Sequence, residues 1–98
     1  MNITKTANGN ELLIALEGRL DTTTSPKLET EIKQSVSGVT NLIIDLAALE
    51  YISSSGLRVL LSTQKVMNKQ GNMIVKNVNE TIMEVFEITG FVDILTIE

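Results

Sequence analysis

Hydrophobic residues follow spacings in this chain that predict a set of short strands. The segments Ile3–Thr6 and Glu11–Glu17 flank the turn sequence Asn8–Asn10, a pattern typical of a β-hairpin. The continuous apolar run Asn41–Leu46 is typical of a strand buried on both faces, and Met73–Val75 indicates another strand. These four segments are expected to form a sheet.

A first helix is predicted after the hairpin. Thr24 or Ser25 can cap it, Pro26 fits its first position, and Gly38 is expected to end it. Its apolar residues recur every four positions, which predicts one stripe facing a core.

Two further helices are predicted downstream. One runs from about Leu57 to Lys69 and stops before Gly71, in the position of a left-handed cap. The other starts at Asn79, runs through Ile88 and ends at Gly90. Ile94–Ile97 is expected to be a weak last strand or an extended tail.

The alternation of strands and helices predicts an α/β fold. We expect one domain over residues 1–98, because the chain has only 98 residues and no room for two independent cores. The expected architecture is a mixed β-sheet of four to five strands packed with three to four α-helices.

Composition excludes several classes of function. Eight Lys and Arg residues against twelve Asp and Glu give a net charge of −4, which argues against binding nucleic acid or an anionic membrane. No apolar run reaches the roughly 18 residues of a membrane span, and the N-terminus does not start like a signal peptide. With no cysteine and no histidine, a thiol nucleophile and a Ser-His-Asp triad are both excluded. A cytoplasmic protein that is not an enzyme and has no cofactor or metal site is expected.

The most informative segment is Ser53-Ser54-Ser55-Gly56, at the junction of a strand and the helix expected from Leu57. A helix start exposes unpartnered N–H groups and is electropositive, so hydroxyls can cap it and a phosphate attached there would meet donors. The segment therefore suits a reversible change of charge. One of Ser53 and Ser55 is expected to cap the helix, and the other to fill a tight turn.

The chain resembles the STAS family of bacterial anti-sigma-factor antagonists over essentially its whole length. The resemblance is carried by Leu42–Leu46 followed by Tyr51–Leu57, by Gly18–Asp21, and by the closing segment Glu87–Phe91. It implies a STAS-like domain whose phosphoacceptor lies two residues before the glycine, which is Ser54. Candidates for contacts beside the phosphoacceptor and with a partner are Asp21, Thr22, Ser53, Ser55, Gly56, Leu57 and Arg58.

The resemblance also implies partners. The first is an anti-sigma factor that is itself a serine kinase of the GHKL type, sequestered by the unmodified chain and released when Ser54 is phosphorylated. The second is a PP2C-type phosphatase that resets the switch. Family members often carry Asp where this chain has Ser53. That replacement removes a charge that opposes the phosphate, or removes a group that the kinase requires.

Each candidate also has a purely structural interpretation. Asp21 is suited to an Asx turn before the first helix, and Asp45 to a turn after its strand. Arg58 is either a phosphate or partner contact, or a solvated arginine. Val59 and Val66 are expected to pack against the adjacent helix, or else to form an exposed apolar patch.

Two alternatives to a phosphorylation switch stay open. The same fold can serve as a scaffold or regulatory subunit of another signalling or transport system, without phosphorylation. Nucleotide binding at the serine-bearing helix start is the other, although Ser53–Gly56 lacks the glycines and lysine of a Walker loop.

Overall fold

Four strands form one mixed sheet in the computed structural model, which describes residues 1–98. The strands are β1 (Asn2–Asn8), β2 (Glu11–Leu20), β3 (Asn41–Ile52) and β4 (Asn72–Lys76), and they lie in the order β1-β2-β3-β4. β1 runs antiparallel to β2, which confirms the predicted hairpin, whereas β2, β3 and β4 are mutually parallel. The expected mixed sheet is therefore present with four strands.

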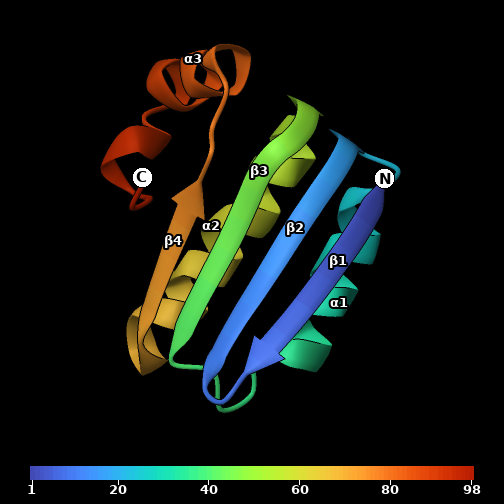
Figure 1. The fold of residues 1–98 in the computed structure, drawn as a ribbon. Helices are drawn as coiled ribbons and strands as arrows, with labels where there is room; N and C mark the ends of the chain where they lie inside the picture. Colours follow the sequence, from blue (N-terminus) through green and yellow to red (C-terminus); the bar gives the residue numbers. More distant parts are fainter.

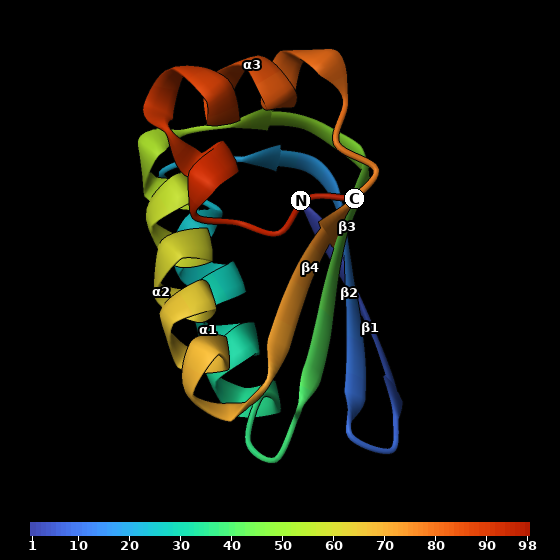
Figure 2. The same ribbon diagram turned by 90° about the vertical axis from the view of Figure 1, so that its left-hand side faces the viewer.

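Two helices cover one face of this sheet. They are α1 (Ser25–Ser35), between β2 and β3, and α2 (Ser54–Gln70), between β3 and β4 (Figure 1). Strand order follows chain order, so two right-handed crossovers in succession place both helices on the same side. Figure 2 shows the two helices side by side, with the opposite face of the sheet bare.

The third helix, α3 (Glu80–Thr89), lies beyond the carboxyl ends of the parallel strands, across the curved end of β3 (Figure 2). Asn79 caps its start, because the Asn79 side-chain oxygen accepts the Ile82 N–H at 2.9 Å, as the sequence predicts. The helix ends at Gly90, which adopts a left-handed conformation with φ 79°. The side-chain amide of Asn79 also donates to the Leu49 carbonyl at 2.9 Å, which ties α3 to β3.

The core lies between the sheet and the helices α1 and α2. In β3, Leu42, Ile44 and Leu46 point towards the helices and are buried, whereas Ile43 and Asp45 on the other face are only half-buried. The prediction that this strand is buried on both faces is therefore wrong. Both crossovers pass on one side of the sheet, so nothing covers the other.

The second helix begins earlier than its apolar pattern predicts. It starts at Ser54 rather than near Leu57, because the serines continue the helix backward to its cap. It ends before Gly71, which is not left-handed but has φ 170°. Glycine is required there for space, since a Cβ would collide with the Thr40 carbonyl oxygen.

The chain ends in a short 3-10 helix, Phe91–Asp93, followed by an extended tail. The tail makes one parallel bridge, between Ile97 and Val75 of β4, so the expected weak last strand is reduced to a single contact. Leu95, which lies between the 3-10 helix and Ile97, is buried and anchors the tail on the core. No helix of the chain is both long enough and apolar enough to cross a membrane.

Candidate functional site

The serine segment lies at the carboxyl edge of the sheet, where two adjacent strands end together. Leu20 at the end of β2 is the register partner of Ile52 at the end of β3. The Ser53 N–H donates to the Leu20 carbonyl at 2.8 Å, which fixes the start of α2 against the end of β2. Because parallel strands share one carboxyl edge, the β2–α1 loop and the first turn of α2 meet there.

Ser53 caps α2. It has an extended backbone (φ −98°, ψ 175°), and its hydroxyl oxygen accepts the Gly56 N–H at 3.4 Å. Its carbonyl accepts the Leu57 N–H at 3.0 Å, the first bond of the helical ladder. Ser55, the other serine considered for this role, lies half-buried within the first turn of the helix and fills no separate turn.

Ser54 is the first helical residue and is exposed to solvent. The N–H groups of the first turn of a helix lack partners within the helix, and the aligned peptide dipoles make this end positive. The most accessible of the three hydroxyls is thus the one that the family resemblance implies as phosphoacceptor.

Gly56 and Leu57 are buried, so they position the helix and do not themselves offer a surface to a partner. A Cβ at Gly56 would lie 2.7 Å from Leu20 Cγ and 2.9 Å from Ile52 Cγ1. The absence of a side chain lets the first turn of α2 pack directly on the ends of β2 and β3. This contact sets where Ser54 lies relative to the ends of β2 and β3.

The β2–α1 loop is organised by the carboxylate of Asp21. Its Oδ1 accepts the N–H groups of Thr23 at 3.0 Å and Thr24 at 3.1 Å, the Asx turn that the sequence suggests. The Thr23 hydroxyl also donates to it at 2.7 Å. These bonds, foremost the one from the Thr23 side chain, hold the pKa of Asp21 below its usual range.

The expected side-chain cap of α1 is absent. Thr24 occupies the cap position, but its hydroxyl donates to the Arg19 carbonyl at 2.8 Å and accepts the Asp21 N–H at 2.8 Å. The Ser25 hydroxyl donates to the Asp21 carbonyl, and Pro26 is the second helical residue. Both hydroxyls are used to close the loop, so they do not cap the helix.

Both arginines of the chain are in or next to this site. Arg58 is one turn beyond Ser54 on α2, is exposed, and forms no ion pair within the chain. Arg19 stacks on the ring of Tyr51, its register partner on β3, with its guanidinium carbon 4.2 Å from the ring centroid. Arg19 Nε is also 4.0 Å from the Asp21 carboxylate.

A shallow polar hollow lies between the first turns of α1 and α2. Thr22, Ser55 and Arg58, three of the sequence-predicted residues, line it together. Val59 also lines it, together with Ser25, Pro26 and Glu29 of α1. These three α1 residues were not predicted as site residues, because the helix-start signals of α1 show only that a helix begins there.

Asp45 belongs to a different part of the molecule. It lies on the bare face of the sheet, where its Oδ1 accepts the Ala47 N–H and the Asn77 side-chain amide, each at 2.9 Å. These bonds, led by the one from Asn77, lower its pKa. Asn77 has φ 58°, so this carboxylate supports a left-handed turn between β4 and α3. The contacts of Asp45 are therefore those of a turn residue, as the structural interpretation predicts.

Comparison with known proteins agrees with this geometry. The family model of the STAS domain matches residues 2–98. BtrV of Bordetella bronchiseptica, which is named as an anti-sigma factor antagonist, is 33% identical and covers 99% of this chain and 85% of its own. The anti-sigma-B factor antagonist of Bacillus subtilis is 30% identical, with 99% and 90% covered.

Solved structures show the same fold at lower identity. SpoIIAA in its unphosphorylated form superposes with a TM-score of 0.78 at 20% identity, over 99% of this chain and 87% of that one. Its phosphorylated form gives a TM-score of 0.78 at 21% identity, over 99% and 91%.

The fold and the serine-bearing helix start together define a STAS-type regulatory domain. The chain belongs to the STAS domain family.

Replacing Gly56 by Ala is expected to destabilise the domain. Overpacking against Leu20 and Ile52 costs about 1–3 kcal/mol, which exceeds the gain of at most about 1 kcal/mol from better helix propensity. Thermal unfolding of Gly56→Ala should show a lower midpoint, whereas Ser62→Ala, at an exposed position of the same helix, should not. Equal midpoints for Gly56→Ala and wild type would show that the close packing is dispensable.

Asp21→Asn is expected to lower stability at neutral pH but not in acid. The pKa of Asp21 is depressed in the folded state, so its contribution is complete above the unfolded pKa and is lost as the pH falls through the folded pKa. The difference in melting temperature between variant and wild type should therefore be larger at about pH 7 than at about pH 2. A difference independent of pH would contradict this role for the carboxylate.

Proposed function

We propose that this chain is an anti-sigma factor antagonist that works by exchanging partners. Unphosphorylated, it binds an anti-sigma factor and so frees the sigma factor; phosphorylated on Ser54, it is released. The observation that carries the proposal is the exposed Ser54 at the capped, rigidly placed start of α2, in a chain similar to named anti-sigma factor antagonists over nearly its whole length.

The position of Ser54 suits a phosphate that leaves the fold intact. A phosphoserine carries about −1.5 to −2 charge at neutral pH, and at a helix N-terminus this charge is favourable by typically 0.3–1 kcal/mol. Arg58 follows four residues later, a spacing at which two Cβ atoms lie about 5–6 Å apart on a helix surface, and it forms no ion pair with a carboxylate of the chain. The phosphorylated domain should therefore stay folded.

The same phosphate opposes a docked partner. At an interface the dianion must lose water or face carboxylates of the partner, and each loss of about 1.4 kcal/mol lowers the affinity tenfold. Phosphorylation thus costs binding and spares stability, which is the asymmetry that a switch requires.

We further propose the identity of the enzymes that set the switch. The anti-sigma factor is itself a serine kinase of the GHKL type, and a PP2C-type phosphatase removes the phosphate. Ser53, which stands where the family often has Asp, is the cap of α2. A serine keeps this capping function while it removes one negative charge next to the phosphate.

Phosphorylation is expected at Ser54 alone among the three serines. Incubation with the purified kinase and ATP, followed by mass spectrometry, should place one phosphate on Ser54 and none on a Ser54→Ala variant. Ser55→Ala, with the neighbouring half-buried hydroxyl removed, is the matched control and should still be modified. Persistent absence of phosphate on wild type would leave only an interaction without a phosphorylation switch.

Ser54→Asp is expected to weaken binding of the anti-sigma factor by about tenfold or more, because it places a negative charge on the docking surface. Its melting temperature should stay near that of wild type, since an acidic residue is favourable in the first turn of a helix. Calorimetric titration and thermal unfolding of the same samples measure both quantities. A large loss of stability would instead make this serine structural.

A further inference from the structure

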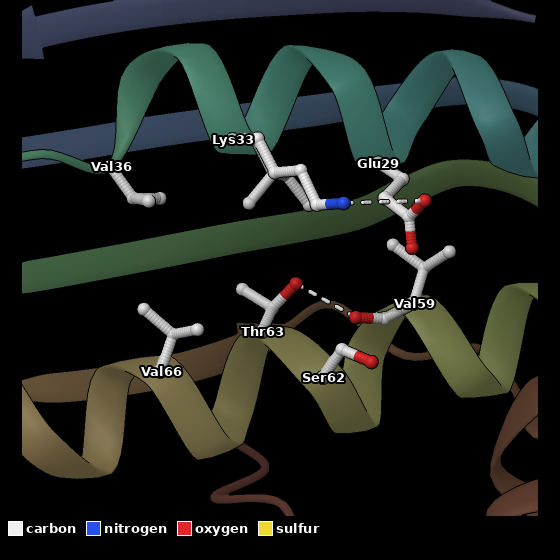
Figure 3. Close-up of a pocket in the computed structure, with 8 residues that line it drawn as sticks. Glu29, Lys33, Val36, Val59, Ser62, Thr63 and Val66 are labelled. Carbon is white, nitrogen blue, oxygen red and sulfur yellow. Dashed lines mark hydrogen bonds and ion pairs between the residues drawn. The ribbon is translucent and has the colours of Figure 1, made fainter.

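An apolar groove runs between α1 and α2 on the outer side of the helix layer (Figure 3). Ile32 of α1 and Val36, the residue that follows α1, line one wall, and Val59 and Val66 of α2 line the other. Ile32 and Val59 are buried at the bottom, whereas Val66 is 43% exposed. Of the two alternatives that the sequence leaves open for Val59 and Val66, packing against the neighbouring helix holds for Val59, whereas Val66 is exposed to solvent.

The hydroxyl donor of Thr63 and the charged pair on the rim of the groove are already partnered within the chain. Thr63 lies at its centre, and its hydroxyl donates to the Val59 carbonyl at 2.7 Å (Figure 3). On the rim, Lys33 Nζ is 3.7 Å from the Glu29 carboxylate, an ion pair along α1. Because the Thr63 hydroxyl hydrogen is already donated, the groove offers a ligand mainly methyl groups from Ile32, Val36, Val59 and Val66.

The groove is continuous with the phosphoacceptor end of the molecule. Glu29 and Val59 line it and also line the polar hollow that contains Ser55 and Arg58. The groove therefore starts beside the first turn of α2 and extends away from it along the two helices.

The size of a stable interface brings the groove within reach of a protein docked on Ser54. Such an interface buries about 800 Å² on each partner, roughly one seventh of the 5442 Å² that this chain exposes. A round patch of that area is about 32 Å across. At 1.5 Å rise per residue, Ser62 lies about 12 Å and Val66 about 18 Å along α2 from Ser54, so one patch of this width can contain both Ser54 and Val66.

The chemistry of the surrounding surface favours the α1–α2 groove over α3 as a contact for the partner. Interfaces have an apolar, well-packed centre and are depleted in charge there. The exposed side of α3 carries Glu80, Glu84 and Glu87, one acidic stripe. The α1–α2 groove instead is concave and apolar.

We propose that the α1–α2 groove is a second docking point for the anti-sigma factor, which inserts an aliphatic side chain between the two helices. This inference rests on the proposed function. The groove holds the partner in register while its active site addresses Ser54, and a phosphate on Ser54 leaves this second contact unchanged. Release on phosphorylation then depends on losing the contact at the helix start.

The test is a charge placed in the groove at a position that folding does not need. Val66→Asp introduces a carboxylate on an exposed side chain, and Thr6→Asp introduces the same group on the exposed outer face of β1, away from both helices. Val66→Thr keeps the shape of valine and should have a small effect. The probe is the recombinant anti-sigma factor shown to phosphorylate Ser54, titrated against each variant, with thermal unfolding of each variant as the folding control.

We expect Val66→Asp to weaken binding at least tenfold, while Thr6→Asp binds within about twofold of wild type and all variants melt near the wild-type temperature. If Val66→Asp binds like wild type while Ser54→Asp is weakened, the groove is not a docking point and the proposed function stands. If neither is weakened, the proposed function itself is wrong. A wild-type dimer in analytical ultracentrifugation that Val66→Asp dissociates, without a change in partner affinity, would assign the groove to a second copy of this chain.

Discussion

The hydrogen bond between the Ser53 N–H and the Leu20 carbonyl joins the two segments on which the functional end of this domain depends. The bond lies where the pairing of β2 and β3 ends and where α2 begins, so the strand register sets the position at which the helix starts. Gly56 reinforces this placement, because it lets the first turn of the helix rest on Leu20 and Ile52. Ser54, the proposed phosphoacceptor, is thus placed by the backbone of two neighbouring strands, while its own side chain stays in solvent.

This division of tasks explains how one residue can be both precisely placed and freely modifiable. Ser53 caps the helix, Gly56 provides close packing, and Ser54 has neither duty. A group whose charge changes with modification can be tolerated there because no packing or capping contact depends on it. The Asx turn at Asp21 holds the β2–α1 loop in place without a bond to Ser53, Ser54 or Ser55.

Much of the fold could be predicted from local patterns. The hairpin, three helices and the order of elements follow from hydrophobic spacing and from Asn79, Gly90 and the serine segment as helix boundaries. The error on β3 came from treating an apolar run as buried on both faces, whereas the strand order that puts both helices on one side is a property of the whole sheet. Local sequence likewise could not show that Gly71 serves to make room for Thr40, since that contact joins distant segments.

For the same reason, only part of the site could be predicted. The acceptor region and Asp21 carry short-range signals, but the pairing of Arg19 with Tyr51 follows from strand register, and the lining by Ser25 and Glu29 follows from helix packing. The α1–α2 groove depends on how far apart the two helices lie at Val36 and Val66, which no pattern along one helix encodes.

The C-terminal tail has a consequence for how copies of the domain meet. Val75 exchanges hydrogen bonds with Thr96 and Glu98 at 2.9 Å each, so the outer edge of β4 is occupied at that residue. At the other edge of the sheet, Lys5 of β1 points to the helix side and pairs with Glu31 at 2.6 Å. An inward-facing charge on an edge strand discourages a further strand from adding there. Residues 96–98 thus block the outer edge of β4 at Val75, and the Lys5–Glu31 ion pair discourages a further strand from adding to β1.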